Sequence, residues 1–180
     1  MSPAENHRNR AAAFGGLVAG VTDWSAPTPV AGWTARDVLT HLVSWPAAFL
    51  ASAGIDLPPV PSEPVAAWTS HAARLQALFD DSPDLVISGT PMGPQPVAEL
   101  LDQIYTGDVF LHSWDLALAS GQLPPLDEET SAMMLAGMTT IEPMLRDSGQ
   151  YGPAVHVGAD RSAVDRLIGF IGRDPDWTPS

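Results

Sequence analysis

The sequence contains no cysteine, which excludes disulfide bonds, thiolate metal sites and a cysteine nucleophile. Any thiol chemistry would therefore use a thiol brought in from outside the chain. Lysine is also absent, and the 8 basic residues, all arginines, stand against 21 acidic residues. The formal charge of -13 argues against partners that need a basic face, namely nucleic acid and anionic membranes.

Long apolar runs are missing as well. No run approaches the roughly 18 apolar residues of a membrane span, and the N-terminus lacks the apolar stretch of a signal peptide. We therefore expect a cytoplasmic protein. What the chain does have is a globular composition, with 45% hydrophobic and 16% charged residues. Its 180 residues are enough to bury a core and suit a single domain over residues 1–180.

Proline clusters divide the chain into helical blocks, because proline interrupts helices. Within each block, apolar residues recur at helical spacing. The predicted helices cover residues 4–21, 35–53, 63–79, 97–119, 128–146 and 162–171. The fourth is apolar nearly all round and should be the most buried. Only residues 85–88 and 154–157 resemble short extended runs. The fold class is therefore all-α, a bundle of four main helices with smaller pieces.

Local signals set the expected helix ends. Residues 2–5 and 34–37 have the form of capping boxes. Ser62 and Asp127 are the expected caps of the third and fifth blocks. Pro46 inside the second block predicts a kink or a local break.

The candidates for chemistry are histidines with an acidic partner at helical spacing. Asp108 and His112 lie four residues apart in the apolar fourth block, which places them on one helix face. A charged aspartate in such surroundings needs a compensating partner, and a metal ion would be one. The alternative is a neutral pair in which Asp108 and His112 hold each other in the core without a metal.

His41 is the best third ligand, because it lies at the margin of the apolar stripe of the second block. Two histidines and one carboxylate leave an open coordination position, as in catalytic zinc sites. The same donor set permits nickel, iron or manganese. The alternative for His41 is an ordinary boundary histidine.

The remaining polar candidates have plainer interpretations. His71 is expected at the surface or boundary, and His7 and His156 are expected to be inert. Asp102 and Asp115 are either acceptors for an imidazole N–H of a ligand or ordinary polar positions.

Three segments carry a family resemblance. They are GWTARDVLTHLV at residues 32–43, DVFLHSWDLA at 108–117 and DRLIGFIGRDP at 165–175. In this order they resemble the DinB/YfiT-like metalloprotein superfamily, and more narrowly the branch that contains mycothiol-dependent maleylpyruvate isomerase. The resemblance to a single-domain subfamily of that branch covers nearly the whole chain.

The resemblance implies an antiparallel four-helix bundle that holds a divalent metal, usually zinc, through His41, Asp108 and His112. The isomerase has glutamate at the position of Asp108, and it has a second, C-terminal domain for which this chain is too short. The implied chemistry is activation of a low-molecular-weight thiol, with mycothiol as the thiol of the family.

Three functions follow as hypotheses. The first is a metal-dependent thiol S-transferase or isomerase, with a small-molecule thiol and an electrophilic substrate as partners. The second is a metal-dependent hydrolase at the same site. The third is a non-catalytic metal- or ligand-binding helical module. Each of the three hypotheses is compatible with a homodimer.

Overall fold

The computed structural model describes residues 1–90 and 93–179; residues 91 and 92, in one of the proline clusters, lie outside the described residues, as does residue 180. The elements are α1 (Pro3–Gly20), α2 (Ala35–Ser52), α3 (Pro64–Asp81), β1 (Val86–Ile87), β2 (Gln95–Pro96), α4 (Val97–Leu101), the π-helical turn η1 (Asp102–Thr106), α5 (Gly107–Ala119), α6 (Glu128–Thr140), α7 (Glu142–Asp147) and α8 (Ala163–Phe170). The strands β1 and β2 form one short antiparallel pair.

Side-chain caps explain where the first helices begin. The predicted capping boxes of α1 and α2 are both formed, by Ser2 with Glu5 and by Thr34 with Asp37. The cap of α3 is Glu63, so the prediction of Ser62 is wrong. The carboxylate of Glu63 is long enough to accept from two successive free backbone N–H groups at the start of the helix.

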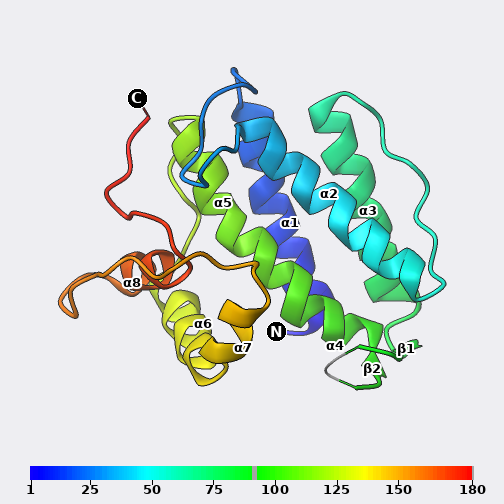
Figure 1. Cartoon of the computed structure of the whole chain (residues 1–180). Coiled ribbons are helices and arrows are strands. Elements are labelled where there is room, and N and C mark those ends of the chain that lie inside the picture. Colours follow the sequence, from blue (N-terminus) through cyan, green and yellow to red (C-terminus); the bar gives the residue numbers. More distant parts are fainter. Residues whose placement is uncertain (91–92, 180) are drawn as a thin grey trace.

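Four helical rods form the predicted bundle. Helix α1 packs against α3 and α5, and α2 packs against α5 and α3 (Figure 1). The chain between α2 and α3 runs back along the bundle, so these two helices point the same way while α1 and α2 run in opposite directions (Figure 1). The guanidinium of Arg74, on α3, fastens this crossover by donating to the carbonyls of Pro58 and Pro59. The all-α fold class predicted from the sequence is confirmed.

The fourth rod consists of α4, η1 and α5 in direct succession, over the range predicted for it. Ten of the thirteen residues of α5 are buried, as the apolar pattern predicts. The π-helical turn in its middle was not expected from the sequence.

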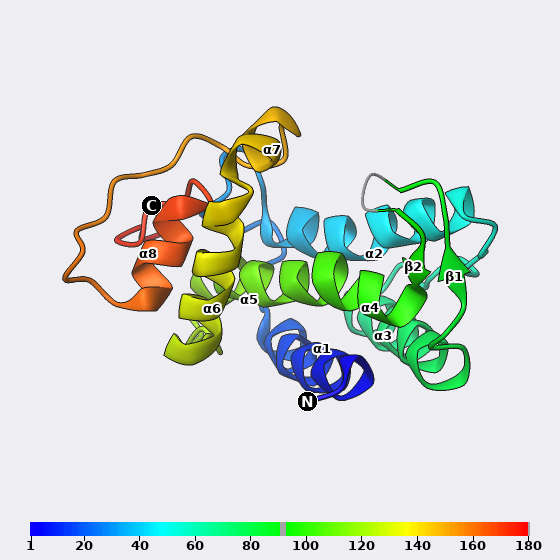
Figure 2. The same ribbon diagram turned by 90° about the horizontal axis from the view of Figure 1, so that it is seen from below.

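Helices α6 and α8 lie on the side of α5 away from α3 (Figure 2), and a second, smaller core forms between them and α5. Phe110, Leu111 and Trp114 of α5 pack there against Leu167 and Ile168 of α8, with residues of α6 at its edge. The single helix predicted over 128–146 is wrong, because α6 ends at Thr140 and α7 starts at Glu142. Pro143 has no N–H to continue the hydrogen-bond ladder, and its ring opposes the carbonyl four residues earlier.

Helix α2 continues through Pro46, which is buried within it, so the local break considered for this proline does not occur, while a kink there stays a prediction. Residues 154–157 form no strand, although the backbone N–H of Val155 donates to the carbonyl of Gly169 (2.9 Å). Among the described residues, no helix combines the length and the apolar character that crossing a bilayer requires.

Candidate metal centre

His41 is positioned by the capping box at the start of α2. It lies one turn after Asp37 and between Val38 and Leu42, both of which are fully buried. Its own side chain keeps 31% of its surface exposed, so it sits at the margin of the buried stripe. The backbone of His41 is therefore fixed in α2, while its imidazole ring remains accessible to solvent.

Asp108 and His112 lie in the first two turns of α5, directly after the π-helical turn. Nε2 of His112 is 3.5 Å from Oδ1 of Asp108, as the four-residue spacing predicts. Single π-helical turns inside α-helices occur frequently at functional sites. The π-helical turn therefore also indicates a functional site near Asp108.

The packing of α2 on α5 brings the three side chains together. Nε2 of His41 is 3.0 Å from Oδ2 of Asp108, and the centroids of the two imidazole rings are 4.9 Å apart. One ligand atom from each of the three residues lies within 4.8 Å of the others. The ligands of a tetrahedral zinc ion, with bonds of about 2.1 Å, lie roughly 3.4 Å from one another. Small side-chain movements would therefore let all three contact one ion, so these residues fit a divalent metal.

A buried carboxylate orients the ring of His112. Nδ1 of His112 is 2.8 Å from Oδ2 of Asp115, whose side chain is buried. Because an ionised carboxylate can only accept, Nδ1 carries a proton, and Nε2 is the ring nitrogen that faces Asp108. This histidine–carboxylate arrangement is typical of metal ligands. Asp115 thus has the acceptor position considered for it, whereas Asp102 accepts from Asn6 (2.8 Å) instead.

The carboxylate of Asp108 is stabilised in its charged form. Burial acts to raise its pKa, but the charge of His112 and the hydrogen bond from His41 outweigh this effect, so the pKa lies below its ordinary value. The indole Nε1 of Trp45 donates a further hydrogen bond to Oδ2 (2.9 Å). Asp108 is therefore an anion at neutral pH, as a metal ligand must be.

Two tryptophans line the centre. The indole of Trp33 stacks on the His112 ring at a centroid distance of 5.6 Å and lies 5.1 Å from the His41 ring. Trp45 lies one turn after His41 on α2. Sequence reasoning did not rank the tryptophans, although the four-residue spacing of His41 and Trp45 was a usable signal.

Two tyrosines respond to the negative charge of Asp108. Burial first, and that charge second, raise the pKa of both Tyr105 and Tyr151 above the ordinary value. Both phenols therefore stay protonated at neutral pH and add no further anion to this region.

The remaining histidines are not part of the centre. His71 is buried rather than at the boundary, so that expectation is wrong, and His7 is buried as well. Their rings pack on Tyr105 from α3 and α1, with centroid distances of 5.8 and 6.0 Å. His156 is exposed.

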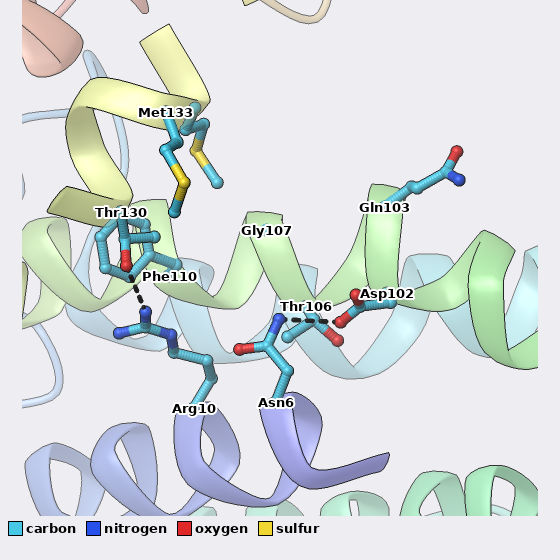
Figure 3. Close-up of a pocket in the computed structure, with 10 residues that line it drawn as sticks. Asn6, Arg10, Asp102, Gln103, Thr106, Gly107, Phe110, Thr130 and Met133 are labelled. Carbon is cyan, nitrogen blue, oxygen red and sulfur yellow. Dashed lines mark hydrogen bonds between the residues drawn. The ribbon is translucent and has the colours of Figure 1, made fainter. Parts of the chain in front are cut away.

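A separate cavity of about 320 Å³ lies between α1, the π-helical turn and α6 (Figure 3). It is lined by Asn6, Arg10, Asp102, Gln103, Thr106, Gly107, Phe110, Thr130, Met133 and Met134. The guanidinium of Arg10 lies over the Phe110 ring and donates to Thr130 (2.9 Å), which ties α1 to α6. Its lining includes none of the three convergent residues.

Comparisons with known proteins show which family the chain resembles. Residues 7–65 match the family model of the mycothiol maleylpyruvate isomerase N-terminal domain, a range that contains His41. Uncharacterized proteins from two strains of Mycobacterium tuberculosis are each 30% identical to the chain over 185 aligned positions, covering 96% of this chain and 98% of the relative. No solved structure matches the chain at a significant level.

Proposed function

Because the chain belongs to the family of the mycothiol maleylpyruvate isomerase N-terminal domain, we propose that it is a metal-dependent enzyme that activates a low-molecular-weight thiol. His41, Asp108 and His112 are the proposed ligands, zinc is the proposed ion and mycothiol the proposed thiol. The thiol is transferred to a small electrophilic substrate or assists its isomerisation. The observation that carries the proposal is the approach of three ligand atoms from α2 and α5 to within 4.8 Å.

When bound, a divalent ion would offer an open position to a thiol and lower the pKa of that thiol, so that the thiolate forms near neutral pH. The protein itself supplies no thiol, since it has no cysteine. The nucleophile must therefore come from a cofactor, which agrees with the thiol named in the matching family.

The residues around the centre have defined tasks in this proposal. Asp115 holds the proton on Nδ1 of His112, so that Nε2 stays free to ligate. Trp45 holds the Asp108 carboxylate in place. The indole of Trp33 shields the two imidazoles from water on one side.

The first test is metal analysis of the purified protein beside His41→Ala and His112→Ala. We expect a stoichiometric divalent metal in the parent and its loss in both variants, because two remaining ligands bind an ion weakly. His156→Ala is the matched control, since this exposed histidine should leave the metal content unchanged. Unchanged metal in the His41 and His112 variants would contradict the ligand assignment.

The second test concerns the chemistry. The metal-loaded protein is mixed with mycothiol and a model electrophile, and consumption of the thiol is followed. We expect turnover in the parent and in His156→Ala, and loss of it in His41→Ala. Metal binding without thiol consumption would instead favour the non-catalytic module, and turnover of an ester without thiol would favour the hydrolase.

A further inference from the structure

A buried ion pair joins the C-terminal segment to the proposed metal centre. Arg173 lies three residues after the end of α8, and its Nη2 is 3.3 Å from Oδ2 of Asp115. Its Nε is 3.4 Å from Oδ1 of the same carboxylate. Oδ2 of Asp115 is also the atom that accepts from Nδ1 of His112 (2.8 Å). The contacts thus form one chain from Arg173 through Asp115 to a proposed ligand.

We propose that Arg173 is a positioning residue: by holding the carboxylate of Asp115 at both oxygens, it fixes the orientation of the His112 ring toward the metal position. The inference rests on the proposed function, because it takes His112 to be a ligand. Arg173 acts only through Asp115 and makes no contact with the ion in this proposal.

Burial gives this contact its importance. Asp115 has no exposed surface, and the Arg173 side chain is 12% exposed. A guanidinium presents its donors in a rigid fork that matches the two oxygens of a carboxylate. A buried carboxylate without such a partner would be free to turn toward other donors. The fork therefore determines which way Oδ2, and with it the imidazole of His112, points.

The local sequence holds Arg173 in place. Gly172 has a positive φ of 90°, and a Cβ there would come within 3.0 Å of the Pro153 carbonyl. This turn lets the backbone N–H of Arg173 donate to the carbonyl of Ile168 (3.0 Å). Its Nη1 also donates to the carbonyl of Ile171 (3.0 Å). Carbonyl groups of the preceding turn therefore hold both the backbone and the guanidinium of Arg173.

The arrangement makes the C-terminal segment part of the site. Leu167, Ile168 and Ile171 anchor α8 in the second core, on the face of α5 that holds Phe110 and Trp114. Arg173 then reaches Asp115, which lies one turn after Leu111 on α5 and contacts His112. The orientation of His112 therefore depends on a residue far along the chain, since Arg173 lies 58 positions after Asp115.

The test compares Arg173→Met with Arg161→Met in the full chain. Arg161 is the matched control, because it also forms ion pairs in the C-terminal segment, with Asp165 and Asp176, but does not reach Asp115. The first readout is the His112 ring in metal-free protein, by two-bond ¹H–¹⁵N spectra. We expect a ring proton held on Nδ1 in the parent and in Arg161→Met, and a mixture of ring forms in Arg173→Met.

The second readout is zinc affinity, measured by competition with a chelator. Loss of a residue that hydrogen-bonds a ligand weakens metal binding by about 10–100-fold. Arg173 acts through such a residue, so we expect a loss at the lower end, about 10-fold, in Arg173→Met only. Should that variant not fold, Arg173→Lys decides, since it keeps the charge beside Asp115 without the fork and should still weaken zinc binding. A parent-like ring spectrum and parent-like zinc affinity in the folded Arg173 variant would overturn the proposal.

The two readouts separate this inference from the proposed function. If the parent binds no zinc, the proposed function fails, and the ring spectrum of the metal-free protein still decides whether Arg173 orients His112. If the parent binds zinc and Arg173→Met binds it equally well with an unchanged ring, only the role of Arg173 fails.

Discussion

At the residue scale, a buried histidine outside the proposed centre makes stability depend on pH. Burial lowers the pKa of His71 from 6.5 to about 4, and the charges of His7 and Arg74 act in the same direction. The unfolded chain therefore binds more protons at this site between pH 6.5 and about pH 4. Stability contributed by neutral His71 is present above pH 6.5 and is lost as the pH falls through this window.

We predict that His71 alone removes about 2 kcal/mol of unfolding free energy between pH 7 and pH 5. The measurement is urea unfolding at both pH values with a chelator present, for the parent and His71→Gln. The variant keeps a side-chain donor but does not titrate, so its pH 7 to pH 5 difference should be smaller than that of the parent. An equal difference in the two proteins would contradict the prediction, and His156→Gln, altered at an exposed position, should behave as the parent.

Among individual residues, the sequence identified those whose convergence follows from helical spacing. The pair Asp108 and His112 could be predicted because four residues make one helix turn, and His41 because it lies at the edge of an apolar stripe. Arg173 could not be found this way, since its approach to Asp115 depends on how α8 packs on the bundle. His71 was assigned to the boundary because three-residue spacing from Trp68 does not tell which side of α3 faces the core.

At the scale of helices, His71 also explains how α2 continues through Pro46. Proline lacks the N–H that would bond to the carbonyl of Leu42, four residues earlier. The backbone of Leu42 acts to raise the pKa of the His71 ring, as a carbonyl facing a ring N–H would. We infer that a ring N–H from α3 takes the place of the donor that Pro46 cannot supply.

This relation predicts coupling between positions 46 and 71. In the parent, His71→Leu leaves the Leu42 carbonyl without a donor, at a cost of about 1–3 kcal/mol. In a Pro46→Ala background the new N–H at position 46 bonds to that carbonyl, so His71→Leu should cost at least about 0.5 kcal/mol less. A double-mutant cycle by urea unfolding measures the difference. Ser44→Ala, on the exposed face of α2, is the control and should show no coupling with His71→Leu.

Helix ends were predictable where short-range chemistry sets them. The boxes at Thr34–Asp37 and Ser2–Glu5 need only residues three apart, and both were predicted correctly. The π-helical turn η1 was not predictable, because it inserts one residue per turn without a proline, and the glycine that follows it, Gly107, is equally compatible with an uninterrupted helix. The interruption between α6 and α7 does have a sequence signal, Pro143. The continuous helical pattern over 128–146 outweighed this proline in the prediction.

At the scale of the whole molecule, α5 belongs to both cores. One face of it packs in the bundle with α1 and α2, and Phe110, Leu111 and Trp114 pack in the second core. The apolar pattern predicted a helix that is apolar nearly all round, but it did not predict that two separate cores share this helix. The proposed ligands Asp108 and His112 therefore lie on a helix that packs in two cores. The single-domain organisation over residues 1–180 stays a prediction.

A metal bound across α2 and α5 should stabilise the whole fold, because an unfolded chain cannot hold three ligands around one ion. Zinc at 100 times its Kd would add about 2.7 kcal/mol to the unfolding free energy. For a chain of this size, that corresponds to a rise in Tm of roughly 5–10 °C. The measurement is thermal unfolding of chelator-treated protein with and without added zinc, for the parent, His41→Ala and His156→Ala. The parent and His156→Ala should gain the full rise and His41→Ala little of it, whereas an equal rise in all three would mean that the ion binds elsewhere.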